Sequence, residues 1–173
     1  MTRHFSLLIA RGCLALLVLV PAAAVYFAID IDAFAALARR ILDLPIQWQS
    51  VSSMQWYGFW LLTTLYVAIG TGGLYFLRRA FTNFARGELF NAANSRDLRW
   101  FSIFLFMQAL AGPLHSALSS VLLSLNHPPG QRMLSITLGS DEIRLIALAM
   151  ILWVVSSLLV KGCQLQRENQ QFV

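Results

Sequence analysis

The sequence has 173 residues, of which 58% are hydrophobic and only 12% are charged, and its formal net charge is +5. Soluble domains contain roughly 45–50% apolar and about 25% charged residues, so this composition excludes an ordinary soluble domain. It indicates one integral membrane domain that covers residues 1–173. The basic residues lie beside apolar stretches and form no single phosphate-binding face, so direct binding of nucleic acid is not expected.

Four apolar stretches are long enough to cross a lipid bilayer, whose core of about 30 Å requires about 20 helical residues. They lie at about residues 12–29, 57–77, 100–123 and 143–160. The sequence therefore predicts an all-α fold in which a four-helix transmembrane bundle is embedded in lipid.

The first stretch also resembles a secretory signal peptide, because Arg3 and Arg11 precede the apolar run and "PAAA" offers a small-residue cleavage pattern. The run continues through "VYFAI" to a spanning length, so we expect a retained helix in which Pro21 introduces a kink. Cys13 and Cys163 form no CxxC or metal-ligand pattern. We therefore expect no disulfide, no metal site and no cofactor.

The distribution of Lys and Arg predicts that both termini are cytosolic. In that orientation nine of the 13 basic residues are cytosolic, namely Arg3, Arg11, Arg78, Arg79, Arg86, Arg96, Arg99, Lys161 and Arg167. The four outside are Arg39, Arg40, Arg132 and Arg144. The cytosolic side then carries a hairpin at residues 78–99, and the outer side carries loops at residues 30–56 and 124–142.

The first outer loop contains a short amphipathic helix that precedes Pro45 and has an aspartate available as its N-cap. Its apolar positions recur at helical spacing and are Phe34, Leu37, Ile41 and Leu44. We expect this helix to lie flat on the outer leaflet or across the mouth of the bundle, either as a connector or as a ligand-binding lid.

Two strand-like segments lie on the same predicted side of the membrane, "PIQWQSVS" at residues 45–52 and "RMLSITLG" at residues 132–139. We expect them to pair as a small exoplasmic β-ribbon. Ser140 is predicted to be the N-cap of the fourth spanning helix, where Asp141 and Glu142 complement the helix dipole.

The polar middle of the chain is predicted to be a helical hairpin. The helix of the second span should continue past Arg78 and Arg79 and stop near Gly87. Asn91 should then cap a new helix that runs into the third span through Trp100.

Here the sequence resembles a known family. "GELFNAANSRDLR", from Gly87 to Arg99, and the ending "LQRENQQFV" are similar to patterns of the bacterial domain-of-unknown-function family 2975. The four spans extend the resemblance over the whole chain. Where the family has a Thr cap and a Glu that completes a capping box, this sequence has Asn91 and Ala93. The resemblance implies a bacterial integral membrane protein without assigned activity, with a small helix-turn-helix regulator encoded nearby as a partner.

Intramembrane polar side chains are the first candidates for function, and the third span carries Gln108 and His115. His115 lies near the break at Gly112 and Pro113, where it either bonds across the bundle or acts as a pH sensor or proton relay. No carboxylate is expected deep in a span, and no HExxH or GxSxG motif is present, so we expect no enzymatic activity. Small residues at the spacing that lets helices approach closely are Ala68, Gly72, Ser116 and Ser120.

We predict a non-enzymatic protein of the bacterial inner (cytoplasmic) membrane, a sensor or modulator of a cytosolic regulator, acting alone or as an oligomer. The residues expected to dock the partner are Arg86, Phe90, Asn94, Arg96, Arg99, Glu168 and Asn169. The alternative is a small transporter or an immunity-type protein that binds a peptide or a lipid. That alternative needs a polar path around Gln108 and His115, and another membrane protein is then the alternative partner.

Overall fold

The computed structural model describes residues 2–42, 46–87, 91–128, 130, 132–136 and 139–171, with the backbone alone at residues 2–3, 163 and 165–171. Its elements are α1 (Thr2–Ile29), α2 (Ile31–Ile41), the short 3₁₀ helix η1 (Trp48–Ser50), α3 (Ser53–Ala85), α4 (Ala92–Ser124) and α5 (Ser140–Gln171). These described residues contain no β-strand. The predicted all-α class is confirmed.

Four of the helices, α1, α3, α4 and α5, are long and apolar enough to cross a membrane. Each of them contains one of the four predicted spans. Large apolar side chains are exposed along all four, among them Val18, Leu65, Leu114 and Ile151. Lipid tails are as apolar as these side chains, so such surfaces need no protein cover in a bilayer. The chain is a multi-pass membrane protein.

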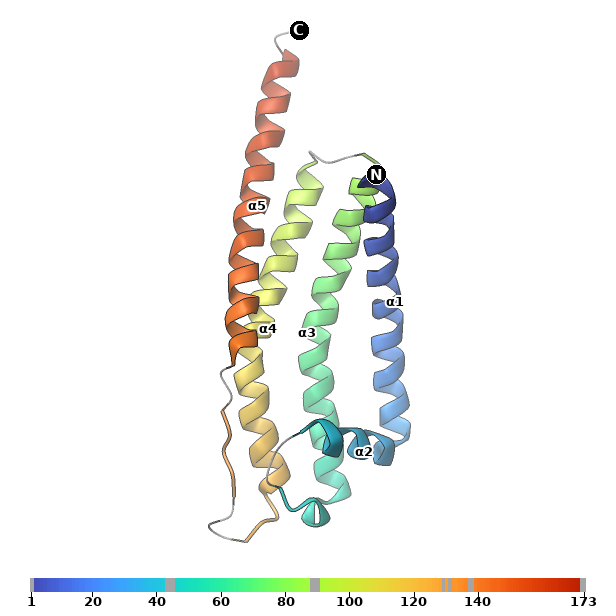
Figure 1. Cartoon of the computed structure of the whole chain (residues 1–173), viewed down its shortest axis with the longest axis vertical. Coiled ribbons are helices and arrows are strands. Elements are labelled where there is room, and N and C mark those ends of the chain that lie inside the picture. The colour runs from blue at the N-terminus through green and yellow to red at the C-terminus, as the bar shows by residue number, and fades with distance from the viewer. Residues whose placement is uncertain are drawn as a thin grey trace.

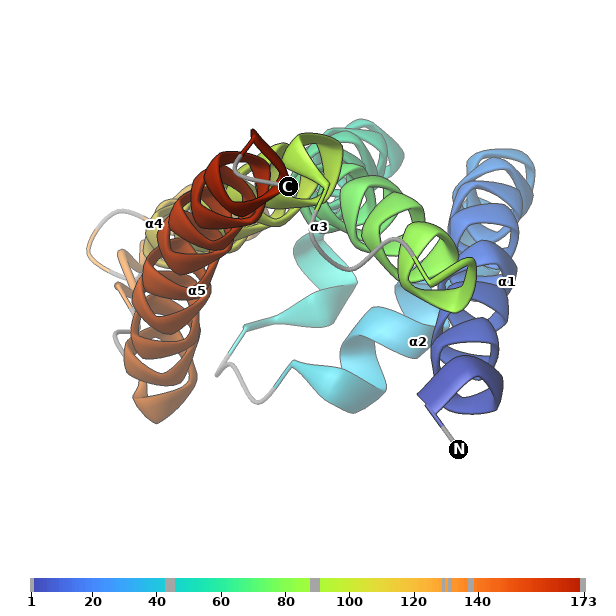
Figure 2. The same cartoon turned by 90° about the horizontal axis from the view of Figure 1, so that it is seen from above.

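The four long helices form one curved layer in the order α1, α3, α4, α5, and α2 lies on one side of that layer (Figures 1 and 2). In the part of the chain that the structure describes, α1 packs on α3, α3 on α4 and α4 on α5, without extensive contact between α1 and α5. The four spanning helices of the predicted bundle are therefore arranged as an open layer. The physical reason is the solvent: lipid covers the apolar faces that water would force inward.

The connection between α3 and α4 defines one end of the molecule, which we call the hairpin end; the opposite end, where α2 lies, is the α2 end. Helix α3 ends at its C-cap Arg86, and Gly87 follows with a φ of +86°. This left-handed conformation favours glycine and stops the helix. Asn91 then accepts a hydrogen bond from the backbone N–H of Ala93 and caps α4. Both boundaries match the sequence prediction.

Helix α2 lies in the segment where a short helix was expected and ends at Ile41, while Leu44 lies outside the described residues. It is capped by Asp30, whose side chain accepts a hydrogen bond from the N–H of Ala33. Its buried residues are Phe34, Ala35 and Ala38. They pack into an apolar core at the α2 end that includes Trp56 and Phe59 of α3. Leu37 and Ile41, which the helical spacing placed on the same apolar face as Phe34, are 41% and 70% exposed. Ala35 and Ala38 lie on the face of α2 that contacts α3, because their small side chains let the two helices approach closely.

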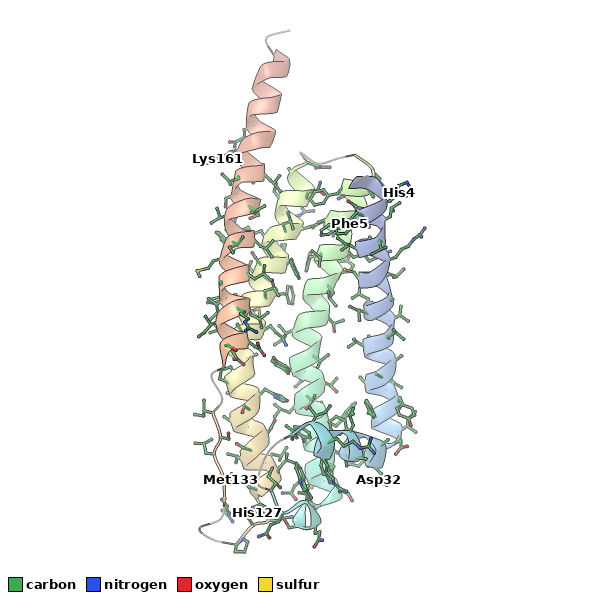
Figure 3. The ribbon with its side chains drawn as sticks, in the orientation of Figure 1. His4, Phe5, Asp32, His127, Met133 and Lys161 are labelled. Carbon is green, nitrogen blue, oxygen red and sulfur yellow. The ribbon has the colours of Figure 1, made fainter. Side chains whose placement is uncertain are left out.

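The predicted β-ribbon is absent from the described residues. The described part of the first segment contains η1, and residues 132–136 of the second run in extended form along α4 (Figure 1). Figure 3 labels Met133 at the foot of this segment, near His127. The backbone of the extended segment bonds to serine hydroxyls of α4 and not to another strand. These hydroxyls supply the donors and acceptors that a second strand would have supplied.

Helix α5 starts beside the middle of α4 and ends beyond it. The Glu142 carboxylate lies next to Gly112 of α4, and Trp153 lies under the guanidinium of Arg99. If the predicted spans at residues 100–123 and 143–160 lay at the same depth, Trp153 would lie beside a residue near Gly112. It lies beside Arg99 instead, so α5 is displaced toward the hairpin end by roughly 15–20 Å at 1.5 Å per residue. Its last turns extend past every other helix (Figure 1). We call this displacement the axial offset of α5.

The start of α5 also differs from the predicted cap. Ser140 is the first helical residue and not the N-cap. The carboxylate of Glu142 accepts a hydrogen bond of 2.8 Å from the N–H of Gly139. A side chain at the third helical position that reaches back to the residue before the helix is one half of a capping box.

Candidate functional site

The exposed basic residues predicted to dock a partner lie at the hairpin end. Arg86 ends α3 and is exposed, and Arg96 and Arg99 are exposed on the first turns of α4. The side chain of Asn94 is fully buried, so it can act on a partner only by positioning the hairpin. Phe90 lies outside the described residues. Glu168 and Asn169 are in α5, where only the backbone is described.

Asn94 belongs to a buried polar cluster between α3 and α4. Asn83 Nδ2 donates a hydrogen bond of 2.7 Å to Asn94 Oδ1. Arg79 Nε lies 3.2 Å from Asp97 Oδ2, and the Asp97 side chain is 1% exposed against 40% for Arg79. Burial of an ionised carboxylate costs free energy unless a charge compensates it. Arg79 therefore offsets part of this cost, although neither carboxylate oxygen of Asp97 accepts a hydrogen bond.

Asp97 is a candidate that sequence reasoning missed, because the sequence analysis gave this residue of the predicted cytosolic hairpin no role. The signal was available in the hairpin itself. Arg79 and Asp97 lie at similar separations on either side of Gly87, as do Phe76 and Trp100, whose rings stack with centroids 5.8 Å apart. In an antiparallel helix pair, residues that are equidistant from the turn face each other.

His115 lies between α3 and α4 toward the α2 end. Its Nε2 is 3.1 Å from Thr63 Oγ1 and 3.5 Å from Ser119 Oγ. Its ring stacks on Tyr66 with a centroid separation of 4.8 Å. These contacts agree with the interpretation of His115 as a residue that bonds across two helices. The histidine ties α3 to α4 at the level where α5 begins.

Gln108 lies one to two turns nearer the hairpin end. Its side chain packs over Gly70 of α3, where the absent Cβ leaves room for the amide group. Its Oε1 atom is buried and has no hydrogen-bond partner. Unsatisfied buried polar atoms are rare in native proteins and call for an explanation. Gln108 is therefore the strongest intramembrane candidate from the sequence.

Glu142 brings a carboxylate to the middle of the layer, which the sequence did not predict. A Cβ added at Gly112 would lie 3.1 Å from Glu142 Oε1 and 3.7 Å from the Tyr66 hydroxyl, so both groups converge on Gly112. The sequence placed Glu142 in an outer loop because it precedes the fourth apolar stretch. The axial offset of α5 carries it to the level of Gly112. No group of three His, Cys, Asp or Glu side chains suited to a metal ion is found in the described part of the chain.

The family model described as "Protein of unknown function (DUF2975)" matches residues 14–173, which is nearly the whole chain. No curated protein and no solved structure matches the sequence.

Proposed function

The chain belongs to the DUF2975 family, and from its geometry we propose that it is a non-enzymatic membrane modulator whose helix α5 reaches a cytosolic protein partner. The single observation that carries this proposal is the axial offset of α5. A helix whose only task was to complete the layer would begin and end level with its neighbours. Helix α5 instead begins beside the middle of α4, so it does not pack on the part of α4 near the α2 end, and it projects beyond the other helices at the hairpin end.

The projecting part of α5 has the composition of a contact surface. Figure 3 shows Lys161 level with the hairpin end of α4. Residues 162–171 continue as helix beyond that level, over about 15 Å at 1.5 Å per residue. They have the sequence "GCQLQRENQQ", which is rich in hydrogen-bonding groups. Exposed Arg86 and Arg96 lie at the same end and extend the surface offered to a partner.

Hydrogen bonds hold the α2 end together, so this end can stay in place while α5 moves. Asn126 Nδ2 donates to the carbonyl of Ser50 and to Gln55 Oε1, and Gln55 Nε2 donates to the carbonyl of Leu122. The backbone N–H of Gln47 bonds to Nε2 of His127. These bonds join the loop around η1 to the end of α4, from which the extended segment leads to α5.

A signal at the α2 end therefore has a direct route to the projecting helix. The extended segment is held to α4 by hydroxyl groups, and α5 follows it after a few residues. A ligand or a change in the membrane that displaced the segment would move α5 along α4. We propose this movement as the output that a regulator senses.

The proposal assumes that the hairpin end is cytosolic, in the inner membrane of a bacterium. Labelling of single cysteines tests this orientation in a variant with Cys13 and Cys163 replaced by serine. Arg96→Cys should resist a membrane-impermeant maleimide in intact cells and react after lysis, and Ser50→Cys should react in intact cells. The opposite pattern would reverse the orientation and refute a cytosolic docking surface.

Docking is tested with the small helix-turn-helix regulator that the family resemblance implies. A regulator of that class is co-expressed with the full chain and with a chain that stops after Lys161. We expect it to co-purify with the full chain and to be lost from the shortened one. Arg11→Gln, a change on exposed α1 surface, serves as the control and should retain the partner. Equal recovery with the shortened chain would refute α5 as the docking helix.

A second function, transport or the binding of a toxic peptide or lipid, is favoured by one observation, the unpaired buried oxygen of Gln108. Replacing Gln108 and His115 together by alanine distinguishes the two. The cellular phenotype to measure is the one that loss of the gene causes. If the double variant fails to restore it and the chain that stops after Lys161 does restore it, the second function is favoured. The reverse result supports the modulator.

A further inference from the structure

An apolar groove of about 410 Å³ lies between α4 and α5 on the side of the hairpin end. Its walls include Ile103 and Phe106 of α4 and Met150 and Val154 of α5. Phe106 is 44% exposed, Met150 58% and Val154 57%, so the groove is open to the surroundings of the helices. In a membrane those surroundings are lipid.

The groove offers almost nothing to a polar ligand. Ser102 is its one residue with a side-chain hydroxyl, and that hydroxyl already donates a hydrogen bond of 2.8 Å to the carbonyl of Arg99. A bound extended peptide would leave backbone N–H and C=O groups without partners, which costs free energy in an apolar site. A hydrocarbon chain has no such groups and fits this lining.

Arg99 marks the groove with a positive charge. Its guanidinium carbon lies 4.3 Å from the ring centroid of Trp153, which itself lines the groove. Arg99 is exposed, and no described carboxylate lies within ion-pair distance of it. Arg96, one helical turn away on α4, is exposed and interacts electrostatically with the buried carboxylate of Asp97, although not at ion-pair distance. Asp97, between them in sequence, is instead paired with Arg79.

We propose that this groove and Arg99 together form a binding site for one anionic phospholipid, with an acyl chain in the groove and the headgroup phosphate on Arg99. A planar guanidinium presents paired donors that match phosphate oxygens. Arg99 directly precedes the apolar stretch at residues 100–123, so its guanidinium lies at the edge of the hydrocarbon region, where a headgroup phosphate is found. Arg99 forms no ion pair with a described carboxylate and Arg96 lies nearby, so the site favours a net negative headgroup over a zwitterionic one that would bring its own cation.

Trp153 provides a built-in reporter for the test. The full chain is reconstituted in phosphatidylcholine vesicles that contain a growing fraction of phosphatidylglycerol or phosphatidylcholine with brominated acyl chains, which quench indole fluorescence on contact. Quenching in the Trp153→Phe variant reports the other four tryptophans and is subtracted. We expect the Trp153 signal to be half quenched at about fivefold lower mole fraction of the anionic lipid.

Substitutions separate the headgroup from the chain. Arg99→Gln should abolish the fivefold preference, and Arg99→Lys should keep part of it because the charge remains. Arg11→Gln, on α1 and remote from α5, is the matched control and should keep all of it. Met150→Phe, at an exposed position on the wall of the groove, should reduce quenching by both lipids.

Three results would overturn the proposal. The first is equal quenching of Trp153 by both lipids in the unchanged chain, which would make the groove ordinary lipid-facing surface. The second is a preference that survives Arg99→Gln. The third is a preference that Arg11→Gln removes as completely as Arg99→Gln does, which would assign it to net charge. Each variant is first checked for the unchanged elution volume of a folded protein.

Discussion

The hydroxyl oxygen of Ser120 accepts a hydrogen bond of 2.9 Å from the backbone N–H of Ser135. One turn further along α4, the hydroxyl of Ser124 accepts from the N–H of Met133 at 3.0 Å and lies 3.3 Å from the carbonyl of the same residue. Ser116 Oγ donates to the carbonyl of Ser135 at 3.2 Å. Three serines at intervals of four thus hold an extended segment against a helix, a task that backbone groups perform in a sheet.

Removal of two of these serines should release the extended segment. We expect Ser120→Ala combined with Ser124→Ala to lower the free energy of unfolding by about 1–3 kcal/mol, because two partly buried amides lose their acceptors. The amides of Met133 and Ser135 should also exchange hydrogen much faster. Thermal unfolding in detergent and mass spectrometry of exchanged peptides measure both effects.

The matched control for these serines is Ser157, which is exposed and bonds only to the carbonyl of Trp153 in its own helix. Ser157→Ala should leave both measurements unchanged. If the double variant exchanged as slowly as the unchanged chain, the hydroxyls would not be what holds the segment. The coupling of the α2 end to α5 would then lose its physical basis.

The Arg79–Asp97 pair should behave as a coupled unit. Arg79→Gln leaves a buried carboxylate without its charge partner and should cost on the order of 2 kcal/mol, less than a fully buried pair because Arg79 is 40% exposed. Asp97→Asn removes the charge and should cost less. The variant with both Arg79→Gln and Asp97→Asn should lose less free energy of unfolding than the sum of the two single losses. Strict additivity, within about 0.5 kcal/mol, would mean that the groups do not interact.

Gly72 should tolerate no side chain. A Cβ there would lie 2.7 Å from Cε1 of Phe104, whose ring also packs on Phe76 with a centroid separation of 5.7 Å. We expect Gly72→Ala to destabilise the contact of α3 with α4 by about 1–3 kcal/mol, the usual cost of overpacking. Thermal unfolding in detergent measures the loss.

Gly12 is the control for that substitution, because a Cβ at this position of α1 meets nothing within 4 Å. Gly12→Ala should be neutral or should stabilise the chain by up to about 1 kcal/mol, the difference in helix propensity. A similar loss at both positions would show that close packing against Phe104 is not the reason for glycine at position 72.

The sequence was sufficient where structure is decided locally. Span lengths follow from apolar runs, and the ends of α2, α3 and α4 follow from Asp30, Gly87 and Asn91. Each of these signals acts within a few residues of where it is read.

The axial offset of α5 could not be read in the same way, because an apolar run fixes the length of a span and not its depth beside a neighbour. That depth depends on long-range contacts, such as Glu142 with Gly112 and Ser120 with Ser135. For the same reason the sequence did not reveal that Ser116 and Ser120 bond to the extended segment. Their spacing is compatible with a close helix contact and with this role, and the second role depends on the position of residues 132–136.

Gln108 offers the sharpest separation of stability from function. Its buried Oε1 has no partner, so replacement by an apolar side chain of similar size removes a desolvation cost. We expect Gln108→Leu to raise the free energy of unfolding by about 1 kcal/mol. A residue that lowers stability and yet is present in the native chain is expected where function requires it. If the variant is more stable and loses the cellular phenotype, the amide belongs to a binding path, and the transport or ligand-binding function gains over the modulator. If it is more stable and fully active, Gln108 has no functional role. A less stable variant would mean that the amide oxygen has a partner after all.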